Sequence, residues 1–117
     1  HQSELLRTGG TRMEGAFFTS SFDPAHPAPL VQEFVRRYQS AFGEEPGVFA
    51  AQGFDAANLT ALQLVRGASG RAALRDALLA VDRYPGVSGP TVVEPDGNTR
   101  KRPFLIEVRS GQLVSIE

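Results

Sequence analysis

The chain of 117 residues contains no cysteine and no tryptophan, and it has only two histidines. Without cysteine there are no disulfides, no thiolate nucleophiles and no cysteine-based zinc sites. Neither His1 nor His26 has sequence neighbours that could complete a metal or catalytic cluster, and no nucleophile–base pair can be assembled elsewhere. These absences argue against an enzyme and against a bound metal or other cofactor.

Charge of one sign and long apolar runs are also missing. The 12 basic and 13 acidic residues are well mixed and give a net charge of −1, so no nucleic-acid partner is expected. No apolar run approaches the ~20 residues that a membrane-spanning helix needs. The chain opens with polar residues rather than with a secretory signal. A hydrophobic content of 41% is nevertheless enough for a folded core.

Three segments have the spacing of helices. Between Leu30 and Phe42 the apolar residues recur at offsets of three and four, which predicts an amphipathic helix that Gly43 ends. A second helix is predicted from Phe54 to Arg66, with a wide apolar face. A third is predicted from Arg71 to about Val81, with Ser69 placed to cap it and with buried positions at Leu74, Ala77, Leu78 and Val81. A shorter helical segment over Ser3–Arg7 precedes them.

Strand signals lie between and after these helices. Aromatic and β-branched residues predict a short buried strand over Ala16–Ser20 and brief strands over Val48–Ala51 and Thr91–Val93. A terminal hairpin is predicted from alternating residues in Arg102–Arg109 and Gln112–Ile116, joined by Ser110 and Gly111. The mixture predicts an α/β fold. Because the strands are too few to cover these helices, we expect a part of a larger fold, or a chain that exchanges strands with a second copy.

One stretch is a candidate ligand-binding site. Gln52, Phe54 and Asp55 follow the predicted strand and open the predicted second helix. Strand ends of open α/β sheets, with the helix N-termini beside them, are common places for ligands. Two interpretations stay open at this point. In the first, Asp55 caps the helix and Phe54 belongs to the core. In the second, both side chains line a ligand together with the Gln52 amide.

Several short motifs resemble those of branched-chain-amino-acid-type (Leu/Ile/Val-binding-protein-like) periplasmic binding proteins. They follow the family's order and spacing over nearly the whole chain, although Glu94 and Pro95 replace the usual pair before one turn. In length, the resemblance covers only the C-terminal third of the family's two-lobed domain. The matching segments are Glu14–Asp23, Phe34–Pro46, Phe49–Ala56, Arg75–Leu78, Pro85–Gly89 and Glu94–Gly97.

The resemblance implies a type I periplasmic-binding-protein fold with two Rossmann-like lobes. Residues 1–28 and 90–117 would belong to the C-terminal lobe and residues 29–89 to the N-terminal lobe, from which Gln52 and Phe54 would line the cleft. It further implies a periplasmic or other extracytoplasmic receptor that captures an amino acid or similar small metabolite for an ABC-type membrane permease. A ligand-sensing or regulatory domain of the same fold is the alternative.

Overall fold

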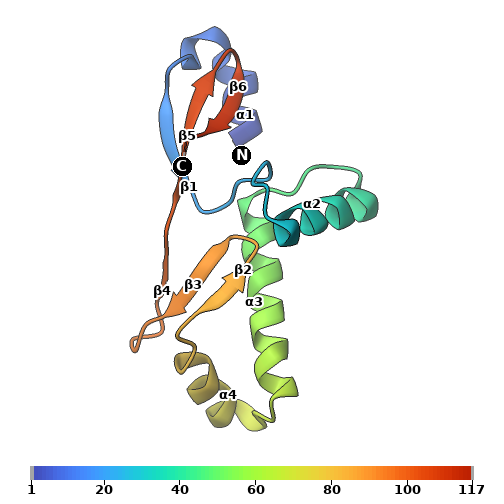
Figure 1. Cartoon of the computed structure of the whole chain (residues 1–117), viewed down its shortest axis with the longest axis vertical. Coiled ribbons are helices and arrows are strands. Elements are labelled where there is room, and N and C mark those ends of the chain that lie inside the picture. The colour runs from blue at the N-terminus through green and yellow to red at the C-terminus, as the bar shows by residue number, and fades with distance from the viewer. Residues whose placement is uncertain (1, 117) are drawn as a thin grey trace.

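The computed structural model describes residues 2–116, which form an elongated molecule of 52 × 31 × 23 Å (Figure 1). Helices and strands are mixed along the chain, which confirms the predicted α/β class. The helices are α1 (Gln2–Gly9), α2 (Pro29–Phe42), α3 (Val48–Val65) and α4 (Gly70–Leu79), with a 3-10 turn at Gly10–Met13. The strands are β1 (Phe17–Ser20), β2 (Tyr84–Gly86), β3 (Gly89–Val93), β4 (Thr99–Lys101), β5 (Phe104–Arg109) and β6 (Gln112–Ser115).

The described strands form two separate three-stranded antiparallel sheets. One has the order β1-β5-β6 and the other β2-β3-β4. Figure 1 shows the first sheet with α1 at one end of the long axis, and the second beside α3 towards the other end. The chain leaves the first sheet after β1 and returns to it between β4 and β5. The predicted lobe boundary at residue 90 falls inside β3; the lobe assignment stays a prediction, and His1 and Glu117 lie outside the described residues.

Helix α2 confirms the prediction from apolar spacing. Pro29 stands at its first turn, where its fixed φ and missing N–H are tolerated. Gly43 ends it in the left-handed conformation, with φ 73°, and donates its N–H to the Gln39 carbonyl. Val31, Phe34 and Val35 form the buried stripe.

Helix α3 begins at Val48, so the strand predicted over Val48–Ala51 is wrong, as is the helix start at Phe54. The β-branched and aromatic residues there favoured a strand locally. Packing decides otherwise, because the helix carries Ala51, which has no exposed surface, into the core beside Phe22 and Val87. The wide apolar face expected for this helix is not fully covered, since Val65 is 86% exposed.

Helix α4 occupies the predicted segment but buries none of its residues. Leu74, Ala77, Leu78 and Val81 are only half-buried, so the prediction that they lie in the core is wrong, and the helix ends at Leu79 rather than near Val81. Ser69 holds the N-cap position without a side-chain capping hydrogen bond.

Strand β1 lies where predicted but is not buried throughout, because Phe17 is 59% exposed.

The main core is small and joins α2, α3 and the segments on either side of them. Phe22 and Phe34 meet edge to face, with ring centroids 5.8 Å apart. The cluster of buried residues consists of Phe22, Val31, Phe34, Val35, Ala51 and Val87.

The predicted hairpin has its own buried residues, Ile106 and Val108 of β5, and Ser110 and Gly111 form its tight turn with positive φ. Within residues 2–116, no helix is both long and apolar enough to cross a membrane.

Candidate ligand-binding site

A large cavity among the described residues has a volume of about 1060 Å³. Its walls come from α1, from the segment after β1, from α2, from the loop between α2 and α3 with the first turn of α3, and from β5 and β6. Cavities of a few hundred to about a thousand Å³ are typical of small-molecule sites. The lining residues are Glu4, Arg7, Phe22, Asp23, Pro24, Ala25, Tyr38, Glu44, Glu45, Pro46, Gly47, Val48, Phe49, Ala50, Ile106 and Leu113.

Phe49 is the most exposed large hydrophobic residue in the wall of this cavity, at 79%. It stands in the first turn of α3, two residues after the extended Gly47 that precedes the helix. Tyr38, Ile106 and Leu113 add apolar surface from other elements. An uncovered aromatic ring in a cavity wall offers contact area to the carbon skeleton of a small molecule.

The charged groups of the cavity are mostly carboxylates. Glu4 is paired with Arg7 at 2.5 Å, and both are largely exposed. Glu44 and Glu45 are exposed in the loop between α2 and α3. Asp23 is buried, and its Oδ1 accepts a hydrogen bond from the Ala25 N–H at 2.9 Å. Four carboxylates therefore face one guanidinium in the lining, an arrangement that suits a ligand with positive or hydrogen-bond-donating groups.

Asp55, one of the three predicted site residues, is only 4% exposed and holds a turn in place. Its Oδ1 accepts from the Val87 N–H at 2.7 Å, and its Oδ2 accepts from the Ser88 N–H at 2.8 Å and from the Ser88 hydroxyl. The Lys101 ammonium lies 3.8 Å from the same Oδ2. The alternative that Asp55 caps the helix is wrong, since it lies well inside α3.

Gln52 lies on the second turn of α3, one turn after Phe49, rather than at a strand end. It is exposed, and its Nε2 donates to the Ser21 hydroxyl at 2.8 Å. Ser21 directly precedes Phe22 and Asp23, which line the large cavity. The side chain therefore ties α3 to the segment that forms another wall of the cavity.

Phe54 is 40% exposed and packs against Phe34 of α2, with ring centroids 4.8 Å apart. Neither Phe54 nor Gln52 nor Asp55 lines the large cavity itself. Their assignment as ligand-binding residues stays a prediction. The described residues hold no group of three or more histidine, aspartate or glutamate side chains placed to bind a metal ion.

The sequence profile of the periplasmic binding protein family matches residues 1–112, nearly the whole chain. The chain belongs to the periplasmic binding protein family. No curated protein sequence matches it significantly. Solved structures of the family match it strongly, and they confirm the type I fold and the branched-chain-amino-acid-type resemblance.

A proposed branched-chain amino acid ABC transporter protein of Rhodospirillum rubrum is 34% identical, with a TM-score of 0.87 over 99% of this chain and 34% of that one. The leucine-binding protein LivK of Thermotoga maritima is 26% identical, with a TM-score of 0.81 over 98% and 33% of the two chains. A Rhodopseudomonas palustris solute-binding protein in complex with 3,4-dihydroxybenzoic acid is 27% identical, with a TM-score of 0.72 over 98% and 33%. The chain thus spans about one third of the length of these structures.

Membership of the periplasmic binding protein family supports a solute-binding role and fits the expectation that the chain is not an enzyme. Phe49 is the residue that sequence reasoning missed as a candidate. It opens one of the family-like motifs, and its offset from the buried residues of α3 places it away from the core. The position of Phe49 outside the core follows only when the helix is taken to begin at Val48, because the side chains of a strand over Val48–Ala51 would alternate between two faces.

Proposed function

We propose that this chain forms one wall of the ligand cleft of an extracytoplasmic receptor that captures an amino acid or a similar small metabolite. The observation that carries the proposal is the cavity of about 1060 Å³ with the exposed ring of Phe49 in its wall. Membership of the periplasmic binding protein family supplies the context in which such a cavity binds a solute. Import through the membrane permease of an ABC transporter completes the proposal, supported by the ABC transporter proteins among the matched structures.

The lining favours a ligand with an ammonium group over a purely aromatic acid. Phe49 and Tyr38 offer apolar surface to the carbon skeleton, while Asp23, Glu44 and Glu45 offer carboxylates. Charge-assisted hydrogen bonds from an ammonium to a carboxylate are among the stronger polar contacts. The matched structures include both a leucine-binding protein and a complex with 3,4-dihydroxybenzoic acid, and we propose the first kind of ligand for this chain.

The predicted site residues remain part of the proposal in adjusted roles. Gln52 supports the cavity through its hydrogen bond to Ser21, and it is exposed one turn from Phe49, where a bound ligand could reach its amide. Phe54 fixes the direction of α3 by packing on Phe34. Asp55 supports the same helix from its buried side.

The test is calorimetric titration of the full-length protein with leucine and with 3,4-dihydroxybenzoate. We expect leucine to bind, and Phe49→Ala to weaken its binding at least about tenfold, because burying an aromatic side chain contributes on the order of 1.5–3 kcal/mol. Phe17→Ala is the matched control, since Phe17 is also exposed but lies on β1 outside the cavity. Equal affinity for the parent and Phe49→Ala would contradict the proposed cleft wall.

Gln52→Ala and Phe54→Ala form a second series in the same titration. Loss of a neutral hydrogen bond costs about 0.5–1.5 kcal/mol, so Gln52→Ala should weaken binding by up to roughly tenfold. Folding of each variant is checked by thermal unfolding. If both variants bind leucine as tightly as the parent, these two residues serve only the fold of α3.

A further inference from the structure

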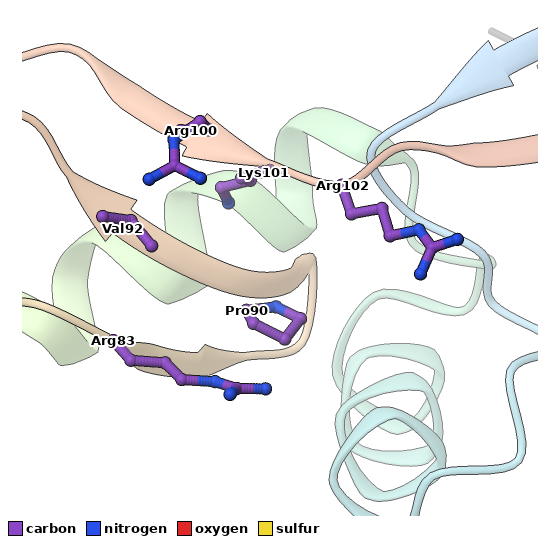
Figure 2. A pocket seen from close by; sticks show the side chains of 6 residues that line it. All are labelled: Arg83, Pro90, Val92, Arg100, Lys101 and Arg102. Carbon is purple, nitrogen blue, oxygen red and sulfur yellow. The ribbon is translucent and has the colours of Figure 1, made fainter.

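A second, smaller cavity of about 370 Å³ lies on the β2-β3-β4 sheet, and Figure 2 shows the residues that line it. It shares no lining residue with the large cavity. Basic side chains dominate it. The lining residues are Arg83, Pro90, Val92, Arg100, Lys101 and Arg102.

Strand register places the arginines of this cavity on one face of the sheet. Val92 of β3 is directly opposite Arg100 of β4. Tyr84 is opposite Thr91, and Arg83 directly precedes Tyr84 and lines the cavity together with Val92. Residues directly opposite in neighbouring strands point to the same face and lie side by side. In Figure 2, Arg100, Val92 and Arg83 follow one another across the cavity and form a row with an arginine at each end.

The other face of the sheet is turned towards α3. Thr91 is buried, and the Lys101 ammonium donates to the Ser88 hydroxyl and lies 3.8 Å from Asp55 of α3. Arg83 and Arg100 are both exposed, as expected for the outward face. In Figure 2 the guanidinium of Arg102 points away from those of Arg83 and Arg100. The row across β3 is thus the part of the cavity where two guanidinium groups flank an apolar floor of Val92 and Pro90.

The positive charge of this row is only partly balanced. Glu94 accepts a hydrogen bond from Arg100 Nε at 2.6 Å. Within residues 2–116, Arg83 has no hydrogen bond or ion pair, and the terminal nitrogens of Arg100 donate no hydrogen bond. The lining contains no carboxylate, and of its four cationic side chains Lys101 is turned towards Asp55 on the other face of the sheet.

We propose that this outward face, defined by Arg83, Val92 and Arg100, binds a phosphate group. Each planar guanidinium presents paired N–H donors that match the oxygens of a tetrahedral oxyanion. Two guanidinium groups offset the charge of a phosphate, which lies between −1 and −2 near neutral pH. The terminal nitrogens of Arg100 reach the phosphate while its Nε remains on Glu94. A free phosphate compound and a phospholipid headgroup share this chemistry.

The test is a titration of the full-length protein with inorganic phosphate at constant ionic strength, followed by NMR shifts of backbone amides. We expect saturable shifts in the segments around residues 83–92 and 99–102. Arg83→Gln and Arg100→Gln should each weaken binding about tenfold, as expected for the loss of a charge-assisted contact. Arg75→Gln is the matched control, because Arg75 is exposed on α4 and pairs with Asp76. Circular dichroism confirms that each variant is folded.

A second variant and a second ligand complete the test. Arg83→Lys keeps the charge but loses the planar pair of donors, so its affinity should fall between those of the parent and Arg83→Gln. Co-sedimentation with phosphatidylglycerol vesicles distinguishes the two sources of phosphate. Binding of vesicles that depends on Arg83 identifies a headgroup, and binding of inorganic phosphate without vesicles identifies a soluble ligand. Absence of both, or equal weakening by Arg75→Gln, would overturn the proposal.

Discussion

The two sheets are held in place by different physical interactions. The β1-β5-β6 sheet buries Ile106 and Val108, apolar residues that alternate on one face of β5. The β2-β3-β4 sheet is attached to α3 by a buried carboxylate, Asp55, that accepts hydrogen bonds from Val87 and Ser88 and lies beside Lys101. The first sheet therefore depends on apolar area removed from water. The second depends on a small set of directional polar contacts in addition to the apolar burial of Val87 in the turn between β2 and β3.

This difference teaches where the two regions tolerate change. A buried apolar position tolerates substitution by another apolar side chain of similar volume with little loss of stability. A buried polar group tolerates substitution poorly, because the loss of one hydrogen-bond partner leaves its other donors or acceptors unsatisfied where water cannot replace it. Gly86 shows how close the second contact is, since a Cβ there would lie 2.3 Å from Asp55 Oδ2. The β2-β3-β4 sheet should consequently lose more stability from one substitution.

The largest effect is expected for Asp55→Ala. The change leaves the Val87 and Ser88 N–H groups without their acceptor and the Lys101 ammonium without its partner. Removing one partner of a buried charged cluster costs about 3–5 kcal/mol. Urea unfolding of the parent and variant measures the difference. Asp76→Ala is the control, because the Asp76–Arg75 pair is exposed and should contribute about 0–1 kcal/mol. If Asp55→Ala lowers the free energy of unfolding no more than Asp76→Ala does, the β2-β3-β4 sheet is not held by the buried carboxylate.

The role of Asp55 also shows what the sequence could not reveal. Its hydrogen-bond partners are 32 and 33 residues away in the chain, so no local pattern connects them. Helix α2, in contrast, was predictable, because its period, the first-turn Pro29 and the terminal Gly43 are all local signals. The predicted hairpin of β5 and β6 is confirmed for the same reason.

The wrong elements have equally specific causes. Val48 and Phe49 favour a strand by composition, and only the packing of Ala51 against Phe22 and Val87 commits them to α3. Strand β2 was missed because Pro85 argues against a strand; it is tolerated here since β2 is at the edge of its sheet. The cavity around Phe49 could not be predicted, because it depends on the approach of α1, the segment after β1, the α2–α3 region and the β5–β6 hairpin, which are distant from one another in sequence.

The next effect in size is expected for Ile106→Ala in the first sheet. Ile106 is buried on β5, and truncating a buried isoleucine costs about 2–5 kcal/mol, with the lower half expected here because it also lines the open large cavity. Urea unfolding again measures the change. Leu105→Ala provides the control on the opposite, exposed face of the same strand and should cost well under half as much. Equal losses for the two variants would show that β5 does not discriminate between its faces.

A smaller effect is expected for Glu14→Ala at the turn of the first sheet. The Glu14 carboxylate accepts hydrogen bonds from the Ser110 and Gly111 N–H groups, at 2.7 and 3.1 Å. Because the site is exposed, water replaces the lost acceptor, and the expected cost is about 0.5–1.5 kcal/mol. Thermal unfolding detects a change of this size. Asp82→Asn, an exposed carboxylate away from this turn, should leave the midpoint unchanged. A Glu14→Ala loss as large as that of Asp55→Ala would place polar anchoring in both sheets and not only in the second.

The smallest effect is a pH dependence that belongs to the second sheet alone. Burial lowers the pKa of Lys101 from 10.5, and the attraction of Asp55 opposes this only in part. Between that lowered pKa and 10.5 the unfolded chain binds the proton more tightly than the folded protein, so stability contributed by Lys101 increases as pH rises through this window. Burial, followed by the charge of Asp55, raises the pKa of Tyr84 above 10.0, so its contribution is present below 10.0 and is lost as pH rises through the raised pKa.

Separating these opposite contributions gives the sharpest test of the second sheet. In a Tyr84→Phe background, the free energy of unfolding should rise with pH towards 10.5, and adding Lys101→Met should remove this rise. Urea unfolding at several alkaline pH values measures both slopes. Glu94→Gln in the same background is the control, because Glu94 pairs with Arg100 on the exposed face and does not contact Lys101. Parallel curves with and without Lys101→Met would mean that the ammonium is solvated like that of a surface lysine, and the polar attachment of the sheet would then rest on the hydrogen bonds of Asp55 alone.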